Sequence, residues 1–525
     1  MIRRQPALVR PIIMLWAFTF FGLLIQAVPS NESTLALTFL VIASAVWSAL
    51  FCIPVYLLSL IALRLEGSIL PAKVATWLTV LTSYLLIVFM VANFKLYSLY
   101  GFYTNYFVIN LISTPGGIDA MGISESTWNS AILAGAAGVI AFLVAVKFLV
   151  LEKVLPHWLS MKHLLVGLVL AFVAETSIYI YADYANLVPV LNTADRIVWY
   201  VPITADSLLE DLGVPRDERF EDELAYSAKT GSLNYFDTTL LAEDSPQKKL
   251  NVVWLVAESW RADTVTPEIM PNTYKFATDQ QWFENHYSGG NGTRMGMFTQ
   301  FYGLYGHYWF DVLRNRRPPL LLEQLRVEDY QFKAITSSAF TYPEFDKTIF
   351  SALDPSNLQE FNEGHGWERD QKNTGDLISF IESSTQPFFA FMFFESAHAN
   401  YYFPDEDIIE EDYIEDFNYI TVDIAESMPQ IKSRYINATH HLDRQIARVI
   451  QSLEENDLMD DTIIVVTGDH GEEFMENGRW GHNSTFSQQQ IRVPMILHIP
   501  GLPAAQHGEM TSHLDMPATV LSALG

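Results

Sequence analysis

The stretch Ile463-Ile464-Val465-Val466-Thr467-Gly468-Asp469-His470-Gly471-Glu472 decides how the C-terminal half of this chain folds. Its apolar, strand-like run stops abruptly at an adjacent carboxylate and imidazole. A buried parallel strand is apolar on both faces, and ligands in open α/β sheets bind just beyond the carboxyl ends of the strands. We therefore predict that Asp469 and His470 lie at the functional edge of such a sheet, where they bind a metal ion.

A second apolar run of the same kind, Asn251–Ala257, ends at Glu258. The glycine-rich loop Gly289–Arg294 adds the hydroxyl group of Thr293. Two carboxylates, an imidazole and a hydroxyl oxygen form a donor set that suits Zn²⁺ or Mn²⁺ better than Mg²⁺ or Ca²⁺. A bound metal would lower the pKa of the hydroxyl group and make it a nucleophile. Taken singly, each residue also has a structural explanation as a helix N-cap or a surface turn.

The first third of the chain predicts a membrane anchor. The chain has 525 residues, of which 50% are apolar, and this apolar excess lies at the front. Five runs are long enough to cross about 30 Å of hydrocarbon with about 20 residues each: Leu8–Val28, Leu35–Leu63, Val74–Phe94, Ala131–Val150 and Leu164–Ala182. The first run lacks the short apolar region and small-residue cleavage site of a signal peptide, which predicts an uncleaved anchor.

Loop charges predict the orientation of this anchor. With a cytoplasmic N-terminus, only Lys95 falls outside, and the other basic residues lie inside: Arg3, Arg4, Arg10, Arg64, Lys73, Lys147, Lys153 and Lys162. This bias follows the positive-inside rule, and an odd number of spans places the C-terminal half on the far side of the membrane. The aromatic segment Lys95–Asn129 between the third and fourth spans is predicted to lie along the outer interface.

The exported part is strongly acidic. Residues 1–184 hold nine of the 32 Lys and Arg residues and seven of the 60 Asp and Glu residues, which leaves 23 basic and 53 acidic residues beyond them. Charge of this sign argues against nucleic acid as a partner. The single cysteine, Cys52, excludes a disulfide within the chain.

From Asn251 onward, apolar strands alternate with helix-like segments, which predicts a mixed or parallel sheet covered on both faces. The clearest helix is Tyr435–Asn456, and the predicted strands are 251–257, about 332–336, 388–394, 463–467 and 493–498. We expect three parts: a five-helix transmembrane anchor over 1–184, a linker and membrane-proximal segment over 185–249, and an α/β catalytic domain over 250–525.

Four segments resemble the sulfatase-like branch of the alkaline phosphatase superfamily over residues 250–525: Asn251–Glu258, Gly289–Arg294, Thr467–Glu472 and Arg492–Ile496. The resemblance implies an α/β domain with a central mixed, mostly parallel sheet. Within this branch, membrane-anchored phosphoethanolamine transferases and lipoteichoic acid synthases carry a Glu, Thr, Asp and His metal set. The matching positions are Glu258, Thr293, Asp469 and His470, and the resemblance implies that Thr293 takes a phospho-group from a phospholipid-type donor and passes it to water or an alcohol.

The front half resembles the five-span PbgA/YejM type of bacterial inner-membrane proteins, through Phe107–Ile112 before Pro115 and through Tyr181–Tyr184 followed by Val198–Val214. This implies a multi-pass inner-membrane protein with a cytoplasmic N-terminus and a periplasmic C-terminal domain. It also implies lipid partners (phospholipid, cardiolipin or lipid A), inner-membrane protein partners and a link to lipopolysaccharide and cardiolipin homeostasis. Some members have a degraded metal site, whereas this chain keeps the whole set.

Three functions are therefore compared. The leading one is a metal-dependent phosphohydrolase or phosphotransferase acting on phospholipid or lipopolysaccharide-related substrates. A non-enzymatic lipid sensor is the alternative. Sulfatase activity ranks third, because the loop Gly292–Gly296 lacks the Cys or Ser of the signature that is modified to formylglycine.

Further residues complete the predicted site, each with a structural alternative. His398 follows the strand Phe388–Phe394 and is predicted to act as a general acid. The predicted substrate-binding residues are Arg294, whose alternative is a salt bridge, Asn291 and His482. A second metal is left open at His482 and Asp263, and Asp263 has the alternative of orienting a ligand. His513 and Asp515 are expected to help close the fold near the C-terminus.

Overall fold

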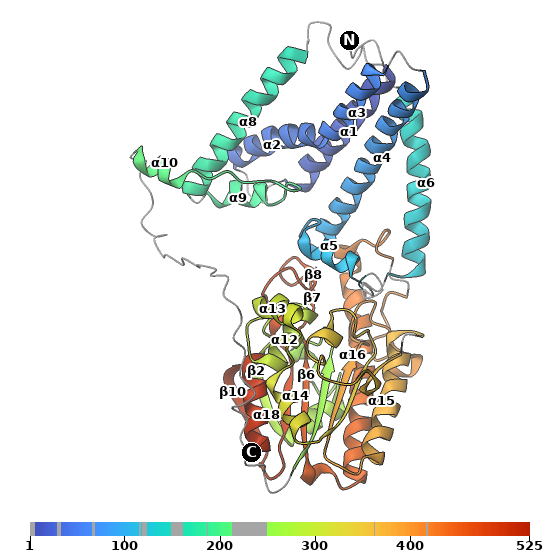
Figure 1. Cartoon of the computed structure of the whole chain (residues 1–525), viewed down its shortest axis with the longest axis vertical. Helices are drawn as coiled ribbons and strands as arrows, with labels where there is room; N and C mark the ends of the chain where they lie inside the picture. Colours follow the sequence, from blue (N-terminus) through green and yellow to red (C-terminus); the bar gives the residue numbers. More distant parts are fainter. Residues whose placement is uncertain are drawn as a thin grey trace. The chain divides into compact units, whose positions relative to one another are not determined.

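The computed structural model of this chain describes residues 6–28, 33–65, 69–114, 117, 123–148, 161–185, 187–212, 249–361, 363–415 and 418–525. It forms two compact units. One consists of Met1–Ser98 and Asn129–Ala228, and the other of Leu99–Trp128 and Lys229–Gly525. The segment between the third and fourth spans therefore folds with the C-terminal domain (Figure 1).

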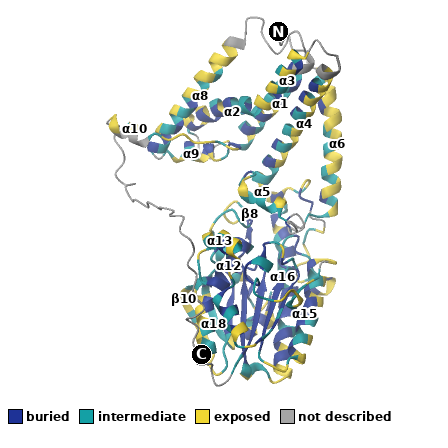
Figure 2. Ribbon diagram, in the orientation of Figure 1, coloured by how far each residue is buried: buried dark blue, intermediate teal, exposed yellow. Residues whose placement is uncertain are grey.

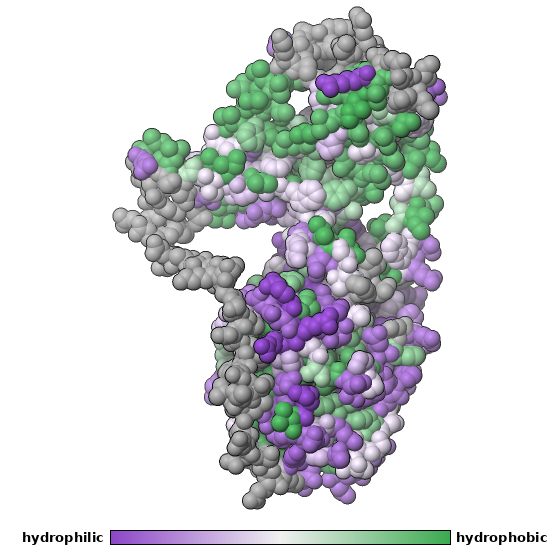
Figure 3. Space-filling view, viewed as in Figure 1, coloured by the Kyte–Doolittle hydropathy of each residue, from purple (hydrophilic) through white to green (hydrophobic). Residues whose placement is uncertain are grey.

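Five helices of the described residues are long and apolar enough to cross a membrane, as the sequence predicted. Large apolar side chains cover their outer surface (Figure 3). Such a surface would be unstable in water, so these helices need hydrocarbon around them. The helices are α1 (Pro6–Gln26), α2 (Thr34–Phe51), α4 (Ile69–Tyr100), α6 (Glu125–Phe148) and α8 (Met161–Tyr184).

The prediction that Leu35–Leu63 forms one continuous span is wrong. The structure divides it at Cys52 into α2 and a separate 12-residue helix, α3 (Ile53–Arg64). Pro54 lies in the first turn of α3. Proline has no backbone N–H to bond the preceding turn, and its ring clashes with that turn, so a helix tends to begin at proline rather than run through it.

Two short helices follow the last span, α9 (Val188–Ala194) and α10 (Asp206–Asp211). Near α9, Tyr200 donates a hydrogen bond to Glu175 of α8 (2.9 Å) and contacts the ring of Phe39 of α2. The first part of the predicted segment 185–249 thus packs against the helical unit. Most of its remainder, residues 213–248, lies outside the described residues.

The C-terminal unit is built on an eight-stranded sheet in the order β10-β2-β9-β6-β1-β5-β3-β4. Only β9, among these strands, runs antiparallel to its neighbours, which confirms the mixed, mostly parallel sheet. The strands are β1 (Asn251–Ala257), β2 (Gln281–Tyr287), β3 (Gln331–Thr336), β4 (Leu358–Glu360), β5 (Phe388–Phe394), β6 (Thr462–Gly468), β9 (Met495–His498) and β10 (Ala505–Ser512).

Helices cover both faces of the sheet, and side chains alternate between the two cores. Val253 and Leu255 of β1 pack toward α11 (Pro271–Thr278), α15 (Gly366–Ser383) and α16 (Ile424–Glu455). Val252 and Trp254 face the other layer, where Trp254 stacks on Phe301. That layer consists of α12 (Thr293–Tyr302), α13 (Trp309–Asn315), α14 (Leu320–Val327) and α18 (Met516–Leu524). Figure 2 shows the strands buried between these helices.

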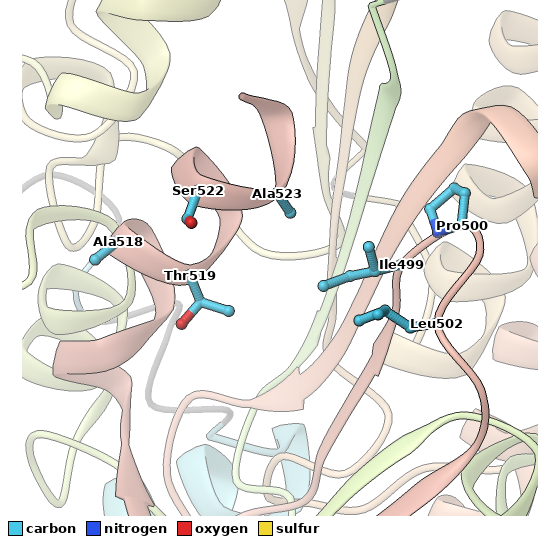
Figure 4. A pocket seen from close by; sticks show the side chains of 7 residues that line it. All are labelled: Ile499, Pro500, Leu502, Ala518, Thr519, Ser522 and Ala523. Atoms are coloured by element: carbon cyan, nitrogen blue, oxygen red, sulfur yellow. The ribbon is translucent and has the colours of Figure 1, made fainter.

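A shallow hollow lies at the edge of the sheet opposite the carboxyl ends of the parallel strands (Figure 4). Ile499 and Leu502 line it from the chain after β9, and Thr519 and Ser522 from α18. Because β9 is antiparallel to β6, with His498 beside Ile464, its end points away from Asp469. None of the predicted site residues lines this hollow.

Candidate active site

Sheet topology brings the predicted ligands from β1 and β6 together. The two strands are parallel neighbours with Ala257 beside Gly468, so the next residues, Glu258 and Asp469, leave the sheet side by side. The N–H of Glu258 donates to the carbonyl of Phe394 in β5 (3.0 Å). All three strand ends therefore open onto one edge, as expected for the carboxyl ends of parallel strands.

Thr293 is the first residue of α12. Its Oγ1 donates a hydrogen bond to Glu258 Oε1 (3.1 Å) and lies 3.3 Å from His470 Nε2. One turn along α12, Gly296 lies so close to the site loop that a Cβ there would be 2.0 Å from the carbonyl oxygen of Asp469. The helix can approach this loop only because residue 296 has no side chain.

Hydrogen bonds orient the side chains of Asp469 and His470 for ligand binding. Asp469 Oδ1 accepts from the N–H groups of Ser259 (3.0 Å) and His470 (2.7 Å), whereas its buried Oδ2 has no hydrogen-bond donor among the described residues. His470 Nδ1 lies 2.8 Å from the carbonyl of Gly471, which can only accept. The proton of a neutral His470 ring therefore sits on Nδ1, and Nε2 keeps its lone pair.

Burial sets the electrostatics of these groups. It raises the pKa of Glu258 to about 7, and it raises that of Asp469 well above its usual value with help from the neighbouring Glu258 charge. Burial also lowers the pKa of His470 well below its usual value. Two carboxylates in a dry site repel each other, and a cation between them would reverse both carboxylate shifts.

These residues fit a divalent metal ion. One ligand atom each from Glu258, Asp469 and His470 lies within 4.8 Å of the others, and all three residues are buried. Asp469 Oδ2, which lacks a hydrogen-bond donor among the described residues, and the lone pair of His470 Nε2 are what such an ion would engage. With the Thr293 oxygen, they form the mixed N and O donor set that suits Zn²⁺ or Mn²⁺.

Two further histidines border this cluster. His398 Nε2 lies 3.6 Å from Glu258 Oε1, and the ring of His482 lies 4.3 Å from that of His470. Burial, together with nearby His482, lowers the pKa of His398 to about 4. A lowered pKa favours the neutral form of His398, and its role as general acid stays a prediction.

The pKa of His482 moves the other way. Burial alone would lower it, but the Glu472 carboxylate raises it overall. Glu472 Oε2 lies 2.8 Å from His482 Nδ1, and Oε1 accepts from the hydroxyl of Tyr401 (2.7 Å). A protonated His482 beside the cluster would suit an anionic substrate.

The sequence did not single out Glu472 as a functional residue. Its only signal was its place in the segment after β6. A similar gap concerns Glu395, which follows β5 as Glu258 follows β1 and pairs with Arg369. Burial raises the pKa of Glu395 to about 7. Glu258 and Glu395 each follow directly after a buried strand, so the rule that found Glu258 would have found Glu395 too.

Other predicted residues have structural partners. Asn291 Nδ2 donates to the carbonyl of Thr485 (2.9 Å), which ties the nucleophile loop to the loop after His482. Asp263 pairs with Arg261 (2.6 Å) and is not a member of the ligand cluster. Near the C-terminus, His513 Nδ1 lies 3.2 Å from the carbonyl of Gly296, and Asp515 Oδ2 accepts a hydrogen bond from the N–H of Ser512 (2.7 Å).

Arg294 forms the salt bridge that the sequence left as its alternative. Its Nη2 donates to Glu344 Oε2 (2.8 Å), both side chains are at most 10% exposed, and the guanidinium lies over the rings of Trp309 and Tyr342. Glu344 thus neutralises the charge next to Thr293. This pairing makes Arg294 part of the scaffold of α12.

Replacing Glu344 with Gln should therefore destabilise the protein strongly, because it leaves a buried guanidinium without its carboxylate. Breaking a buried pair in this way costs about 3–5 kcal/mol. We expect a clear fall in the thermal unfolding midpoint of the detergent-solubilised protein. Glu323→Gln, which breaks the more exposed pair of Glu323 with Arg326, is the matched control and should change stability by less than about 1 kcal/mol. An unchanged midpoint in Glu344→Gln would show that Arg294 is not held by this pair.

Comparison with known proteins agrees with this architecture. Residues 250–525 match the sulfatase family, and residues 12–241 match a domain of unknown function (DUF3413). The inner membrane protein YejM of Salmonella typhimurium is 25% identical over 357 residues, covering 67% of this chain and 55% of YejM. An uncharacterized protein of Haemophilus influenzae is 24% identical over 362 residues, covering 67% of this chain and 54% of that protein. The chain thus spans about half the length of these curated relatives.

A solved structure shares the fold of nearly the whole chain. It is the integral membrane protein lipooligosaccharide phosphoethanolamine transferase A (EptA) from Neisseria meningitidis, with a TM-score of 0.61. The match covers 98% of this chain and 95% of EptA at 16% identity, so it shows the fold alone. The family match over residues 250–525 confirms the resemblance seen in the sequence: this chain belongs to the sulfatase family.

Proposed function

We propose that this chain is a metal-dependent phosphohydrolase or phosphotransferase that acts on membrane phospholipid or lipopolysaccharide-related substrates through Thr293. One observation carries the proposal: the Thr293 hydroxyl lies within hydrogen-bond reach of Glu258 and His470, two members of the three-residue ligand cluster. The N-cap of α12 is Gly292, so Thr293 is not the helix cap, and a metal held by these ligands would activate its hydroxyl as a nucleophile.

Each side chain has a defined task in this reaction. When bound by Glu258, Asp469, His470 and Thr293, a divalent ion supplies Lewis-acid stabilisation of the negative charge on oxygen. Thr293 Oγ1 forms a new bond to phosphorus as the bond from phosphorus to the leaving alcohol breaks. The hydroxyl proton passes to Glu258, its hydrogen-bond acceptor, and the leaving alkoxide takes a proton from water. Water or an acceptor alcohol then attacks phosphorus and gives up its proton to solvent as the bond from phosphorus to Thr293 Oγ1 breaks. Thr293 takes back the proton held by Glu258.

His398 and His482 flank the cluster and are proposed to contact the phosphoryl oxygens or the leaving group. The nucleophile at 293 also separates this reaction from the usual sulfatase chemistry. A threonine cannot be converted to formylglycine, so the proposed intermediate is a phosphothreonine ester. The non-enzymatic lipid sensor remains the alternative, and the intact ligand cluster disfavours it.

The membrane anchor supports a lipid substrate. YejM is named an inner membrane protein, and EptA a lipooligosaccharide phosphoethanolamine transferase. We propose an inner-membrane location, with the N-terminus in the cytoplasm and the domain over 250–525 in the periplasm, joined to the anchor over 1–184 by residues 185–249. An anchored domain meets lipid substrates, which are confined to the membrane, at a high effective concentration. Protein partners in the inner membrane would meet the anchored protein within the plane of the same membrane.

A substrate comparison tests the proposal. The full chain in detergent should hydrolyse a chromogenic phosphodiester, lose this activity to a chelator, and regain it with Zn²⁺ or Mn²⁺. An aryl sulfate offered at the same concentration should not be turned over, because the chain has no residue for formylglycine at position 293. Metal-dependent release of sulfate, or phosphodiester turnover that survives complete metal removal, would refute the assigned chemistry.

A further inference from the structure

The segment Leu99–Trp128, between the third and fourth spans, belongs to the C-terminal unit. Leu99 lies in the core formed with α16 and the sheet. At the other end of the segment, Thr127 Oγ1 accepts a hydrogen bond from the N–H of Tyr419 (3.1 Å). Both ends of a segment that continues into spanning helices are therefore built into the domain that carries the candidate active site.

Tyr100, the last residue of α4, contacts the two residues that precede His482. Its ring stacks on that of the buried Trp480, with ring centroids 5.8 Å apart and an angle of 23° between the rings. The hydroxyl groups of Tyr100 and Tyr419 share a hydrogen bond, and Tyr419 also packs against Trp480. Tyr100 and Tyr419 together hold the indole ring in place.

Trp480 and Gly481 form the short strand β8, which pairs with β7 (Glu473–Phe474). Gly481 has a φ of +90°, and a Cβ on it would be 3.3 Å from the ring of Tyr100. Tyr100 therefore packs directly against the backbone of residue 481. The next residue is His482, whose ring lies against His470.

We propose that Tyr100 is a positioning residue for His482. Its ring fixes the Trp480–Gly481 backbone, and this backbone places the His482 imidazole beside the metal cluster, where Glu472 holds Nδ1. Through Tyr100, the end of a spanning helix becomes part of the support of the active site. The proposal rests on the function proposed above and adds that the segment after the third span, which belongs to the C-terminal unit, orders the site.

His482 reaches the cluster from a two-stranded hairpin, and such a hairpin is at best marginally stable without packing against other elements. Tyr100 and Tyr419 supply this packing on Trp480. A displacement of about 1 Å in a catalytic or binding group can lower turnover by about a hundredfold. Loss of the Tyr100 ring should therefore act on turnover without touching Glu258, Asp469 or His470.

The test compares Tyr100→Ala and Tyr100→Phe in the full chain in detergent. We expect Tyr100→Ala to lower kcat/KM for a chromogenic phosphodiester by about a hundredfold while the bound metal stays at the wild-type level. Tyr100→Phe keeps the stacked ring and loses only one hydrogen bond, so it should stay within about fivefold of the wild type. Ile112→Ala, in the exposed helix α5 (Tyr106–Ser113) of the same segment, is the control and should change nothing.

A double-mutant cycle distinguishes positioning from a general structural role. Tyr100→Ala added to His482→Ala should cause no further loss beyond about twofold, because both variants remove the same contribution. Losses that multiply would overturn the proposal, as would wild-type turnover in Tyr100→Ala. If Tyr100→Ala loses its metal, Tyr100→Leu, which keeps apolar bulk without a stacking ring, takes its place in the cycle.

Hydrogen exchange supplies a readout that does not need activity. Tyr100→Ala should speed exchange in peptides covering Glu473–Asn483 and leave those covering β1 unchanged, whereas unchanged exchange in the hairpin would contradict the proposal. If the wild-type protein turned over no phosphodiester at all, the proposed function would fail, and the exchange result alone would still decide whether Tyr100 positions the hairpin.

Discussion

Replacing Thr293 with Ala should lower the rate of phosphodiester turnover by a factor of at least about 10⁴. The structure places the hydroxyl group 3.1 Å from Glu258 Oε1 and 3.3 Å from His470 Nε2. Among the described residues, Thr293 is the hydroxyl side chain that bonds to side-chain atoms of this cluster, and alanine offers no oxygen to form the ester with phosphorus. Initial rates on a chromogenic phosphodiester, with metal content measured on the same samples, give the result.

Thr293→Ser is the matched control. Serine keeps the attacking oxygen and loses only a methyl group, so it should retain measurable, metal-dependent turnover. Thr293→Ala should still hold metal, because Glu258, Asp469 and His470 remain. Wild-type rates in metal-loaded Thr293→Ala would remove Thr293 from the mechanism and reopen the search for a nucleophile.

Asp469→Asn should have the second largest effect, this time on metal binding. The amide keeps an oxygen that accepts from Ser259 and His470, but it removes the negative charge at Oδ2. Even residues that only orient metal ligands change affinity by 10- to 100-fold, so we expect the affinity for Zn²⁺ or Mn²⁺ to fall by at least about 100-fold. Titration with a competing chelator measures this loss.

The same variant should have opposite effects on stability with and without metal. Burial and Glu258 raise the pKa of Asp469, so the folded, metal-free protein disfavours its charged form. A carboxyl group whose pKa is higher in the folded than in the unfolded protein destabilises the fold at pH 7, because the same group is ionised in the unfolded chain. Metal-free Asp469→Asn should therefore unfold at a higher temperature than metal-free wild type, and the order should reverse when metal is added.

Asp263→Asn is the control for this experiment. Asp263 pairs with Arg261 and is 57% exposed at its side chain, outside the ligand cluster. Its replacement should leave the metal affinity unchanged. A large loss of metal in Asp263→Asn, with none in Asp469→Asn, would show that Asp469 is not the carboxylate that binds the metal.

The core of the site could be predicted because its signal lies in short stretches of local sequence. An apolar run followed by a carboxylate marks the edge of a parallel sheet, and the parallel register of β1 and β6 brings Glu258 and Asp469 together. The strands β2 and β10 were not predicted. Their residues are largely exposed or half-buried and polar, so neither carries the continuous apolar pattern of a central strand.

Contacts between distant segments were beyond the reach of local patterns. The pair of Arg294 with Glu344 joins residues 50 positions apart, so the sequence could offer a salt bridge only as an alternative, without naming its partner. The stacking of Tyr100 on Trp480 joins a spanning helix to a hairpin across most of the chain. Nothing in either segment alone specifies the other, because packing complementarity appears only in the folded structure.

The central claim is that Glu258, Thr293, Asp469 and His470 form one metal-activated nucleophilic site. Its most direct test is to quench the full chain during phosphodiester turnover, count the bound metal, and map any phosphorylated residue by mass spectrometry. We predict bound Zn or Mn that is lost in Asp469→Asn, together with a phospho-adduct on Thr293 that is absent from Thr293→Ala. A phospho-adduct on a different residue, or turnover by protein that holds no divalent metal, would contradict the account.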